Sequence, residues 1–511
     1  MPFDCSGNFV PDTVDHFELE RSSTSATAGF QMINSNIAPC TRQFIDTTVP
    51  NPTFWYRLTG RTVNGVPIPY NVVSVTHAAG LVWVRDIASV GVQCNSVKAD
   101  SSNNFNVCGS WGGTRIDFGG QVFTKVGTNA DAFLAKYSSS NVLVQPAISL
   151  GDQSGSDDSC QMLAIDSAGN RIVGGYFFGT MDFGGTSKTA TDGISVFVAS
   201  YTSTGTLNWV TAFSGSGNRQ VTGLSVDSSR DLYVVIKYNS ETNCQNGFTL
   251  PFPASHFGVV KLDHADGSTL WAKGFGSSFS DQPKKCEVDN AGHLYVTGFI
   301  GAATNFGGGD TANAGGFVVK LSTTDGSYIA GFGSKVFANS NMIHGVCVDL
   351  STGHVFICGS FTTTNIDLGG GNIHSEYGQV GGLFVVSYLN DGTWIWNIAH
   401  GKAETNDAAL AIASNNAGKI AFCGGAGGLI DWNNNGINVT SAGGFVIAVY
   451  SSAGAFQWAI RGGSPSTAVS VAFDSAGNVA MCGTFSGTID FGGTSPTATG
   501  FPDGFLAKYT A

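Results

Sequence analysis

Charge is scarce in this sequence. Charged residues make up 12% of the 511 residues, roughly half the ~25% of a typical soluble protein. Glycine is correspondingly abundant, with 70 residues, about twice its usual ~7% share. A chain so poor in charge cannot supply many solvated helical faces. Because 42% of the residues are hydrophobic, the composition favours a large core built from short strands that are joined by glycine turns.

Basic clusters are also lacking. The net charge is −12, and Lys284-Lys285 is the only adjacent basic pair. Since phosphate contacts depend on clustered Lys and Arg, we expect no nucleic-acid partner. Nothing approaches an 18-residue apolar run, so we expect no membrane insertion. The opening MPFDCSGNFVPDTVDHFELE lacks a basic segment followed by an apolar one, so we expect no signal peptide. The compartment stays open; synthesis in the cytosol followed by incorporation into a particle or appendage fits this pattern.

The eleven cysteines contain no CxxC pair. Four of them directly precede a glycine: Cys108, Cys358, Cys423 and Cys482. Zinc sites need closely spaced ligand pairs, so we predict no metal site here. A small apolar side chain that fills a repeated core position is the better interpretation.

Two markers recur along the chain at the same interval. One is a turn of the form Asp-x-x-Gly-Asn, spaced by 60 to 66 residues. Its copies begin at Asp100, Asp166, Asp227, Asp289, Asp349, Ser414 and Asp474. The other is a strand such as FLAKY or FVASY, whose copies begin at Phe133, Phe197, Phe257, Phe317, Phe384, Phe445 and Phe505. Seven copies of two independent markers indicate a repeat protein.

Each unit is typical of four short strands. The first precedes the Asp turn, the second follows it, the third is the Phe-rich marker, and the fourth usually carries a tryptophan such as Trp209 or Trp458. These segments are rich in Val, Phe, Ile and Tyr and end at Gly or Asp. Four-stranded units of about 60 residues predict an all-β, seven-bladed β-propeller.

The ring needs a closing strand, and the N-terminal part of the chain offers one. The last unit reaches only its third strand, whereas LVWVRDIASVG at 81–91 provides a fourth, with Trp83 at the tryptophan position. This exchange would hide a sheet edge. VVSVTH at 72–77 also resembles a third strand, which leaves eight blades as an alternative. We therefore predict a propeller at 70–511 and an N-terminal arm or extension at 1–69. The predicted units are 92–151, 152–217, 218–278, 279–340, 341–404, 405–464 and 465–511 completed by 81–91.

The combined pattern is D-x-x-G-N, then G-x-F-x-G-T-x-D-F-G-G, then D-x-F-[VL]-A-K-Y, then a Trp strand. It resembles the bacterial-type β-propeller repeat family called SBBP over residues 81–511, most closely at 152–217 and 465–511. The resemblance implies a propeller fold. It implies no catalytic residues, because scaffold positions define that family.

The DFGG element contains the Asp-Phe-Gly triplet of a kinase metal site, but it occurs in most units, as IDFGG at 116–120 and 489–493 and as IDLGG at 366–370. A kinase uses a single such Asp with further catalytic groups elsewhere. A repeated element with exchangeable Phe is instead typical of a turn, in which Gly adopts positive φ and Asp accepts backbone hydrogen bonds. The Asp-x-x-Gly-Asn turns likewise lack the alternating ligands of a calcium loop.

Function in a repeat protein is expected where the repeat departs from itself. Three loops depart: 237–253, which lacks DFGG; the insert GNIHSEYGQVGG; and the Asn-rich WNNNGINVT. From these loops we select seven candidate binding residues: Asn243, Phe248, His374, Glu376, Tyr377, Trp432 and Asn434. Amide and aromatic groups on loops are suited to protein or sugar contacts, although drift in solvent loops gives the same pattern.

The sequence contains no HExxH, GxSxG or P-loop motif, so we predict no catalytic residue and no cofactor. We expect a non-enzymatic structural or adhesive propeller whose partner is a protein in a larger assembly, such as a virion or surface appendage, or a surface glycan. One alternative is a glycan-active lyase or hydrolase with its site over the central channel, and a lectin-like module is another. Clustered Asp, Arg or His at the channel would favour the enzyme, and Ser, Ala and Gly would favour the scaffold.

Overall fold

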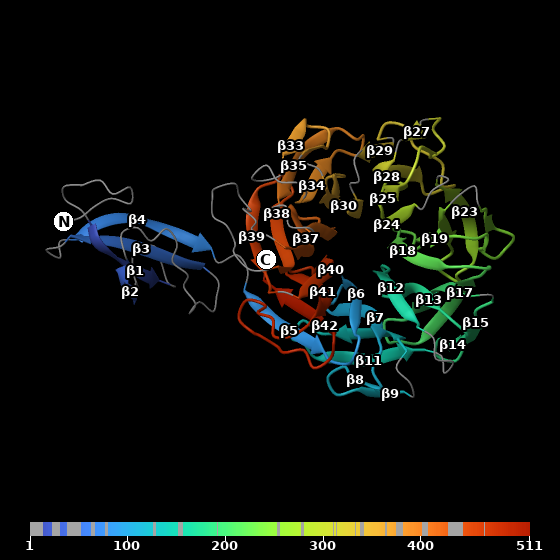
Figure 1. The fold of residues 1–511 in the computed structure, drawn as a ribbon, viewed down its shortest axis with the longest axis horizontal. Coiled ribbons are helices and arrows are strands. Elements are labelled where there is room, and N and C mark those ends of the chain that lie inside the picture. Colours follow the sequence, from blue (N-terminus) through green and yellow to red (C-terminus); the bar gives the residue numbers. More distant parts are fainter. Residues whose placement is uncertain are drawn as a thin grey trace. The chain divides into compact units, whose positions relative to one another are not determined.

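The computed structural model divides the chain into two compact units, Met1–Gly80 and Leu81–Ala511 (Figure 1). The structure describes residues 14–22, 31–37, 53–62, 67–76, 80–125, 129–151, 157–191, 193–252, 256–276, 281–309, 311–312, 314–332, 334–337, 342–362, 365–374, 382–400, 407–427, 443–463 and 465–510.

The first unit holds a four-stranded antiparallel sheet. Its strands are β1 (Val14–Ser22), β2 (Gln31–Ile37), β3 (Thr53–Thr62) and β4 (Pro67–Thr76), in the order β2-β1-β3-β4. The segment VVSVTH was predicted as a possible strand of an eighth blade, and this alternative is wrong. Most of it lies in β4, which pairs with β3 over nearly its whole length. The boundary therefore falls after Gly80, eleven residues beyond the predicted end of the extension at 69.

The second unit is the predicted seven-bladed propeller. Its described residues form seven four-stranded antiparallel sheets arranged around a central axis. Blade 1 consists of β6 (Gln93–Ala99), β7 (Phe105–Trp111), β10 (Asp131–Tyr137) and β11 (Leu143–Leu150). Blade 2 consists of β12 (Ser159–Ile165), β13 (Arg171–Phe177), β16 (Ser195–Tyr201) and β17 (Leu207–Phe213). Blade 3 consists of β18 (Arg219–Val226), β19 (Leu232–Tyr238), β22 (Phe257–Leu262) and β23 (Thr269–Phe275).

Blade 4 consists of β24 (Gln282–Val288), β25 (His293–Ile300), β28 (Gly315–Ser322) and β29 (Ser334–Phe337). Blade 5 consists of β30 (Met342–Val348), β31 (Val355–Phe361), β34 (Gly382–Tyr388) and β35 (Trp394–His400). Blade 6 consists of β36 (Ala408–Ser414), β37 (Lys419–Ala426), β38 (Gly444–Ser451) and β39 (Phe456–Arg461). Blade 7 consists of β40 (Ser466–Phe473), β41 (Val479–Phe485), β42 (Asp503–Tyr509) and β5 (Leu81–Ile87).

The ring closes as predicted. β5 pairs antiparallel with β42, and Trp83 lies opposite Lys508. Blade 7 thus combines strands from the two ends of the second unit, which covers the edge of β42 without a covalent turn.

The first strand of each blade is the innermost, and successive first strands contact one another around the axis. The core lies between blades. In one cluster, Cys108 and Leu134 of blade 1 pack with Phe177 and Phe197 of blade 2, and all four side chains are fully buried. The repeated Phe residues are therefore filler between adjacent sheets.

The DFGG elements form small hairpins at the rim (Figure 1). The described hairpins are β8 (Arg115–Asp117) with β9 (Val122–Thr124), β14 (Thr180–Asp182) with β15 (Ser187–Thr189), β20 (Thr242–Asn243) with β21 (Thr249–Leu250), β26 (Thr304–Asn305) with β27 (Thr311–Ala312), and β32 (Asn365–Asp367) with β33 (Asn372–His374). Blade 7 has only an isolated bridge between Thr488 and Thr497 there.

The predicted turn chemistry of DFGG is confirmed. Asp182 Oδ1 accepts hydrogen bonds from the amides of Gly184 (3.1 Å) and Gly185 (2.8 Å), and both glycines have φ of +100°. Phe183 is fully buried between blades 1 and 2. Blades diverge with distance from the axis, so each hairpin acts as a wedge that fills the widening gap.

The Asp turns also serve the scaffold. Asp166 Oδ1 accepts hydrogen bonds from the amides of Ala168 (3.0 Å) and Asn170 (2.8 Å). In the sixth unit the equivalent residue is Asn415, whose Oδ1 accepts from Ala417 and Lys419 at 2.9 Å each. The predicted marker Ser414 was therefore one residue too early.

Lysines from the third strands reach two of these turns. Lys136 lies 2.8 Å from Asp100, and Lys508 lies 3.2 Å from Asp474. In these two blades the Asp and Lys side chains pair with each other inside the blade. The other third-strand lysines have different partners: Lys261 pairs with Asp231, and Lys320 donates to the Asn390 carbonyl.

Tryptophans on the fourth strands form hydrogen bonds between neighbouring blades, and we call each such bond a Trp latch. In four blades an indole N–H of the fourth strand donates to a carbonyl in the turn between the third and fourth strands of the next blade. The pairs are Trp83 to Ser139 (2.9 Å), Trp209 to His264 (2.9 Å), Trp271 to Thr323 (3.2 Å) and Trp396 to Ser452 (2.9 Å). Trp458 faces blade 7, where no such turn joins β42 to β5, and its buried indole nitrogen has no hydrogen-bond partner among the described residues.

The four cysteines before glycines fill the core, as predicted. All four are fully buried and free. Burial raises the pKa of the Cys108 thiol to about 12, so these groups stay protonated. The thiols of Cys358 and Cys482 donate to the carbonyls of Ala409 (3.4 Å) and Cys94 (3.6 Å) in the first strand of the next blade.

Candidate functional site

Residues 237–252 depart from the repeat in sequence but not in structure. Asn243 takes the place of the DFGG aspartate, and its Oδ1 accepts a hydrogen bond from the Gln245 amide at 2.8 Å. Cys244 is fully buried in the place of the phenylalanine, and its amide bonds to the carbonyl of Phe248 at 2.8 Å. Phe248 is half-buried against the core between blades 2 and 3. Both predicted residues therefore have scaffold roles, and their binding role stays a prediction.

The other predicted loop residues are placed only in part. His374 is the last residue of β33, where its backbone pairs with Asn365. Glu376, Tyr377, Trp432 and Asn434 lie outside the described residues. The structure therefore does not bring the seven predicted residues together into one site.

A different loop presents an exposed aromatic ring. Phe501, just before β42, is 79% exposed, more than any other large hydrophobic residue in the described part of the chain. The backbone beside it is fixed by the fully buried Asp503, which accepts hydrogen bonds from the amides of Thr499 (2.6 Å) and Gly500 (2.9 Å). The Pro502 carbonyl accepts a further bond from the Val92 amide at 3.1 Å. A rigid loop thus holds a bare phenyl ring in solvent.

The central channel contains a second candidate site, which is formed by repeated bulges. All seven first strands shift register at the same place against their second strands. One residue in each blade is left without a partner there. These residues are Asn95, Gln161, Thr222, Lys284, His344, Leu410 and Val469, and we call them the bulge ring. A β-bulge re-aims a side chain and often lies beside a functional site.

The glycine of each Cys-Gly pair permits this bulge. A Cβ on Gly109 would lie 1.8 Å from the Gln93 carbonyl oxygen, and one on Gly483 would lie 1.9 Å from the Thr467 carbonyl oxygen. Glycine leaves room for the inner-strand carbonyl in these blades, whereas blade 3 forms the same bulge with Ile236 opposite Val221. The Cys-Gly pairs seen in the sequence therefore mark the channel bulges.

Lysines gather beside the bulge ring. A cavity of about 220 Å³ is lined by Lys237, Lys284 and Lys285 together with Gln161, Thr222 and His344. Burial, and next the charge of Lys237, lowers the pKa of Lys284. Burial, and next the charge of Lys98, lowers the pKa of Lys285. Burial also lowers the pKa of His344 to about 4, so its imidazole is neutral at pH 7.

Farther along the channel the lining includes Lys98 and Glu287. Burial raises the pKa of Glu287 above its usual value, and Lys98 and Lys285 oppose this shift. Glu287 is the one carboxyl group among the described residues that line these channel cavities. The lining therefore matches neither of the two patterns named as discriminators: His344, Ser96, Ser470 and Ala411 occur together with Lys98, Lys284 and Lys285.

Sequence reasoning missed the bulge ring although a signal was present. Each ring residue lies five positions before the turn residue of its unit, as Lys284 does before Asp289. In the sequence, Lys284-Lys285 stands out only as an isolated basic pair. The bulge decides which strand face each of the two lysine side chains occupies, and the bulge was not predicted.

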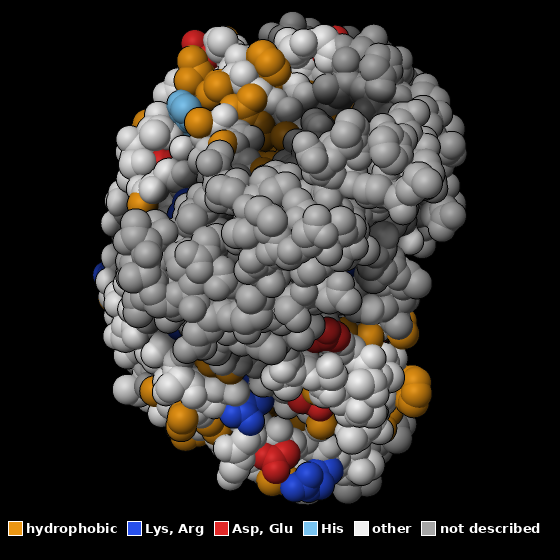
Figure 2. Space-filling view, turned by 90° about the vertical axis from the view of Figure 1, so that its left-hand side faces the viewer, with side chains coloured by type: hydrophobic (Ala, Val, Ile, Leu, Met, Phe, Trp, Pro, Cys, Tyr) orange, Lys and Arg blue, Asp and Glu red, His pale blue; other side chains and the backbone are white. Residues whose placement is uncertain are grey.

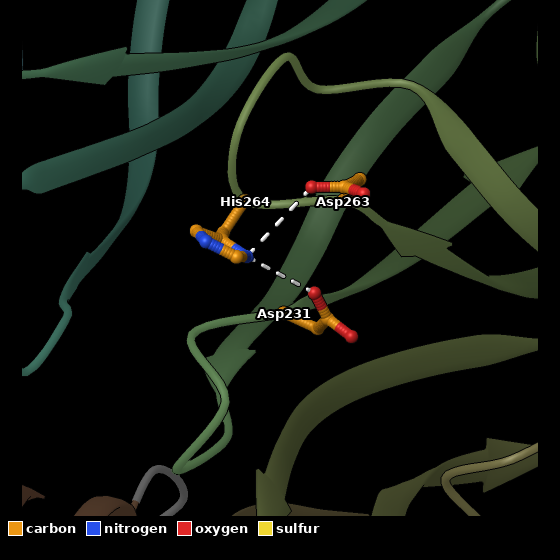
Figure 3. A group of neighbouring side chains, drawn as sticks. All are labelled: Asp231, Asp263 and His264. Carbon is orange, nitrogen blue, oxygen red and sulfur yellow. Dashed lines mark hydrogen bonds and ion pairs between the residues drawn. The ribbon is translucent and has the colours of Figure 1, made fainter.

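A small polar cluster on blade 3 is a weaker candidate (Figure 3). His264 Nδ1 lies 3.4 Å from Asp231 and 3.7 Å from Asp263. The three side chains could each offer one ligand atom to a metal ion. Asp231, however, already pairs with Lys261 at 3.1 Å, so the cluster is satisfied as an ion-pair network.

The described surface agrees with the low charge of the sequence. On the face drawn in Figure 2, most described atoms belong to uncharged groups, and the few Lys, Arg, Asp and Glu side chains gather mainly at its lower end. Among the described residues, no helix has the length and apolar character needed to cross a membrane.

The fold and site define the class as a seven-bladed β-propeller. No protein-family model matches the chain, and no curated protein matches it; the resemblance to SBBP repeats therefore stays a prediction. Solved structures with a similar shape include U3-55K (10% identity, 78% of this chain and 90% of that chain, TM-score 0.43). The WD40 repeats of RRP9 are also similar (9% identity, 83% and 97%, TM-score 0.43). So is a protein of unknown function from Dyadobacter fermentans (9%, 85% and 99%, TM-score 0.37). Identities and TM-scores this low say nothing about ligand or activity.

Proposed function

We propose that this protein is a non-enzymatic propeller that binds a protein partner within a larger assembly. The observation that carries this proposal is the Phe501 loop, in which buried Asp503 fixes the backbone while the ring is 79% exposed. Aromatic side chains dominate the energy of protein interfaces. A loop whose backbone is already held in place loses less conformational entropy on binding than a free one does. Val90 lies in the β5–β6 connection, whose Val92 amide bonds to this loop, and it is also 60% exposed.

The scaffold around the loop supports a structural role. The Asp, Lys, Tyr and Trp side chains that recur in the repeat form hydrogen bonds and ion pairs within and between blades. Such a network produces a rigid disc and leaves the non-repeated loops to make contacts. A virion or surface appendage remains the kind of assembly that we propose, and the predicted loop residues Tyr377 and Trp432 keep a surface glycan as the second type of partner.

A photo-crosslinking amino acid at position 501 tests this proposal in the cells that make the protein. We expect one discrete protein adduct that is absent when the crosslinker replaces Lys188 on the rim. An equal adduct pattern at both positions would overturn the role of Phe501. Binding on a glycan array that Phe501→Ser leaves unchanged and Trp432→Ala abolishes would favour the lectin-like role.

A further inference from the structure

Lysines outnumber carboxyl groups along the described part of the channel, where Glu287, in the adjoining cavity that Lys285 and Lys98 also line, is the one carboxyl group. Lys237, Lys284 and Lys285 line the cavity of about 220 Å³, and none of the described side chains around it carries a carboxyl group. The Lys285 ammonium instead lies 3.1 Å from the Met162 sulfur. Burial is the main cause of the lowered pKa values of Lys284 and Lys285, and repulsion by Lys237 and by Lys98, respectively, adds to it. An anion in this cavity would relieve that repulsion.

Hydrogen-bonding groups beside these lysines are also unused. The Thr222 hydroxyl and the Gln161 side-chain oxygen are buried, and neither has a hydrogen-bond partner within the described part of the chain. Thr222 is only 9% exposed. A buried polar atom without a partner destabilises the protein, so these atoms indicate a site that a ligand or water completes.

The bulge ring is polar on one side of the channel and apolar on the other. Blades 1 to 5 contribute Asn95, Gln161, Thr222, Lys284 and His344, whereas blades 6 and 7 contribute Leu410 and Val469. Seven equivalent bulges could have carried seven similar side chains. The polar arc and the short apolar arc therefore suit a ligand with one charged end and one apolar end.

The ligand class follows from the type of cation. The described cavity lining contains lysine and no arginine. A lysine ammonium is a compact point charge that accepts oxyanions of different geometry, whereas arginine selects planar, bidentate ones. We propose that the central channel binds a small organic anion, with its carboxylate or phosphate at Lys284 and Lys285 and its apolar part at Leu410 and Val469.

Calorimetric titration of the full chain with phenyl phosphate, benzoate and inorganic phosphate tests this site. We expect phenyl phosphate or benzoate to bind, and the stronger of the two identifies the anionic group. Lys284→Gln should weaken that binding by about tenfold or more, because a hydrogen bond to a charged group is worth about 1.5–3 kcal/mol. The matched control is Lys188→Gln on β15, which should not change binding.

Two further variants complete the test. Leu410→Asn should weaken the organic probe while it leaves inorganic phosphate unchanged, since only the organic probe uses the apolar arc. Lys237→Gln replaces Lys284→Gln if thermal melting shows that the latter does not fold. Absence of binding by every probe, or equal losses in the Lys284 and Lys188 variants, would overturn the proposal.

Discussion

The hydroxyl group of Tyr201 donates a hydrogen bond to the carbonyl of Phe183 at 3.1 Å. Tyr201 ends the third strand of blade 2, and Phe183 is the aromatic residue of its DFGG turn. The same bond joins Tyr137 to Phe118, Tyr388 to Leu368 and Tyr509 to Phe491. The two sequence elements are therefore halves of one contact that fastens the rim hairpin to its blade.

Tyr201→Phe should lower the stability of the propeller by about 1–3 kcal/mol, because the Phe183 carbonyl would remain buried without a partner. Thermal melting measures this loss. Tyr176→Phe is the control, since Tyr176 is half-buried and its hydroxyl has no hydrogen bond to a described residue. Equal melting temperatures for the Tyr201 variant and the wild type would contradict the role of the bond.

The Trp latch predicts different effects for two tryptophans of β35. Trp396 donates to the Ser452 carbonyl of the next blade, whereas Trp394 is 37% exposed and bonds to Asn397 of its own strand. Trp396→Phe should therefore lower the melting temperature more than Trp394→Phe does. Hydrogen exchange at residues 451–455 should become faster in the Trp396 variant only. The reverse order would show that the latch does not join blades 5 and 6.

Gly454, which packs against the Trp396 ring, is required for its backbone conformation and for its lack of a side chain. Gly454 has φ of +89°, and a Cβ there would lie 2.9 Å from the Trp396 ring. Gly477 has φ of +83° with nothing within 4 Å. Alanine at either position should cost about 1 kcal/mol or more for the left-handed backbone, and Gly454→Ala should cost more because the ring must move. Equal losses in chemical denaturation would show that the ring contact is unimportant.

The channel histidine predicts a pH dependence of stability. Burial, reinforced by Lys284, lowers the pKa of His344 to about 4 from an ordinary 6.5. Between these values the unfolded chain binds a proton that the folded protein does not, so this contribution to stability is complete above pH 6.5 and is lost as the pH falls toward 4. His344→Gln should remove this component. Melting temperatures from pH 7.5 to 4 measure it, and a constant difference between variant and wild type would contradict it.

Ring closure by β5 predicts unequal effects of two truncations. A chain that begins at Leu81 keeps all 28 propeller strands, seven blades of four, and should melt cooperatively. A chain that begins at Val92 lacks β5, exposes the edge of β42, and should be less stable and aggregate. Size-exclusion chromatography and thermal melting distinguish the two. Equal behaviour would show that β5 does not close the ring.

Much of the scaffold could be predicted because each repeat position makes the same local contact. Seven copies of the Asp turn and the Phe strand determine the propeller repeat and strand order, and Trp83 identifies the closing strand. The register of residues 67–76 could not be predicted, since β4 finds its partner in β3 rather than in a repeat. The sequence also marked 237–253 as a departure from the repeat, although Asn243 and Cys244 only replace Asp and Phe in a turn of the same form.

The sequence by itself determined the propeller repeat, its closing strand and the scaffold role of DFGG, because these depend on periodicity and on turn chemistry that neighbouring residues complete. The choice of seven blades over eight needed the pairing of β4 with β3. Only the tertiary structure decided which side chains meet at the axis. Lys284, His344 and Leu410 are separated by about sixty residues each in sequence, and a bulge in every inner strand brings them to one level of the channel. It also left Phe501 in solvent, which depends on the distant contacts that hold its loop.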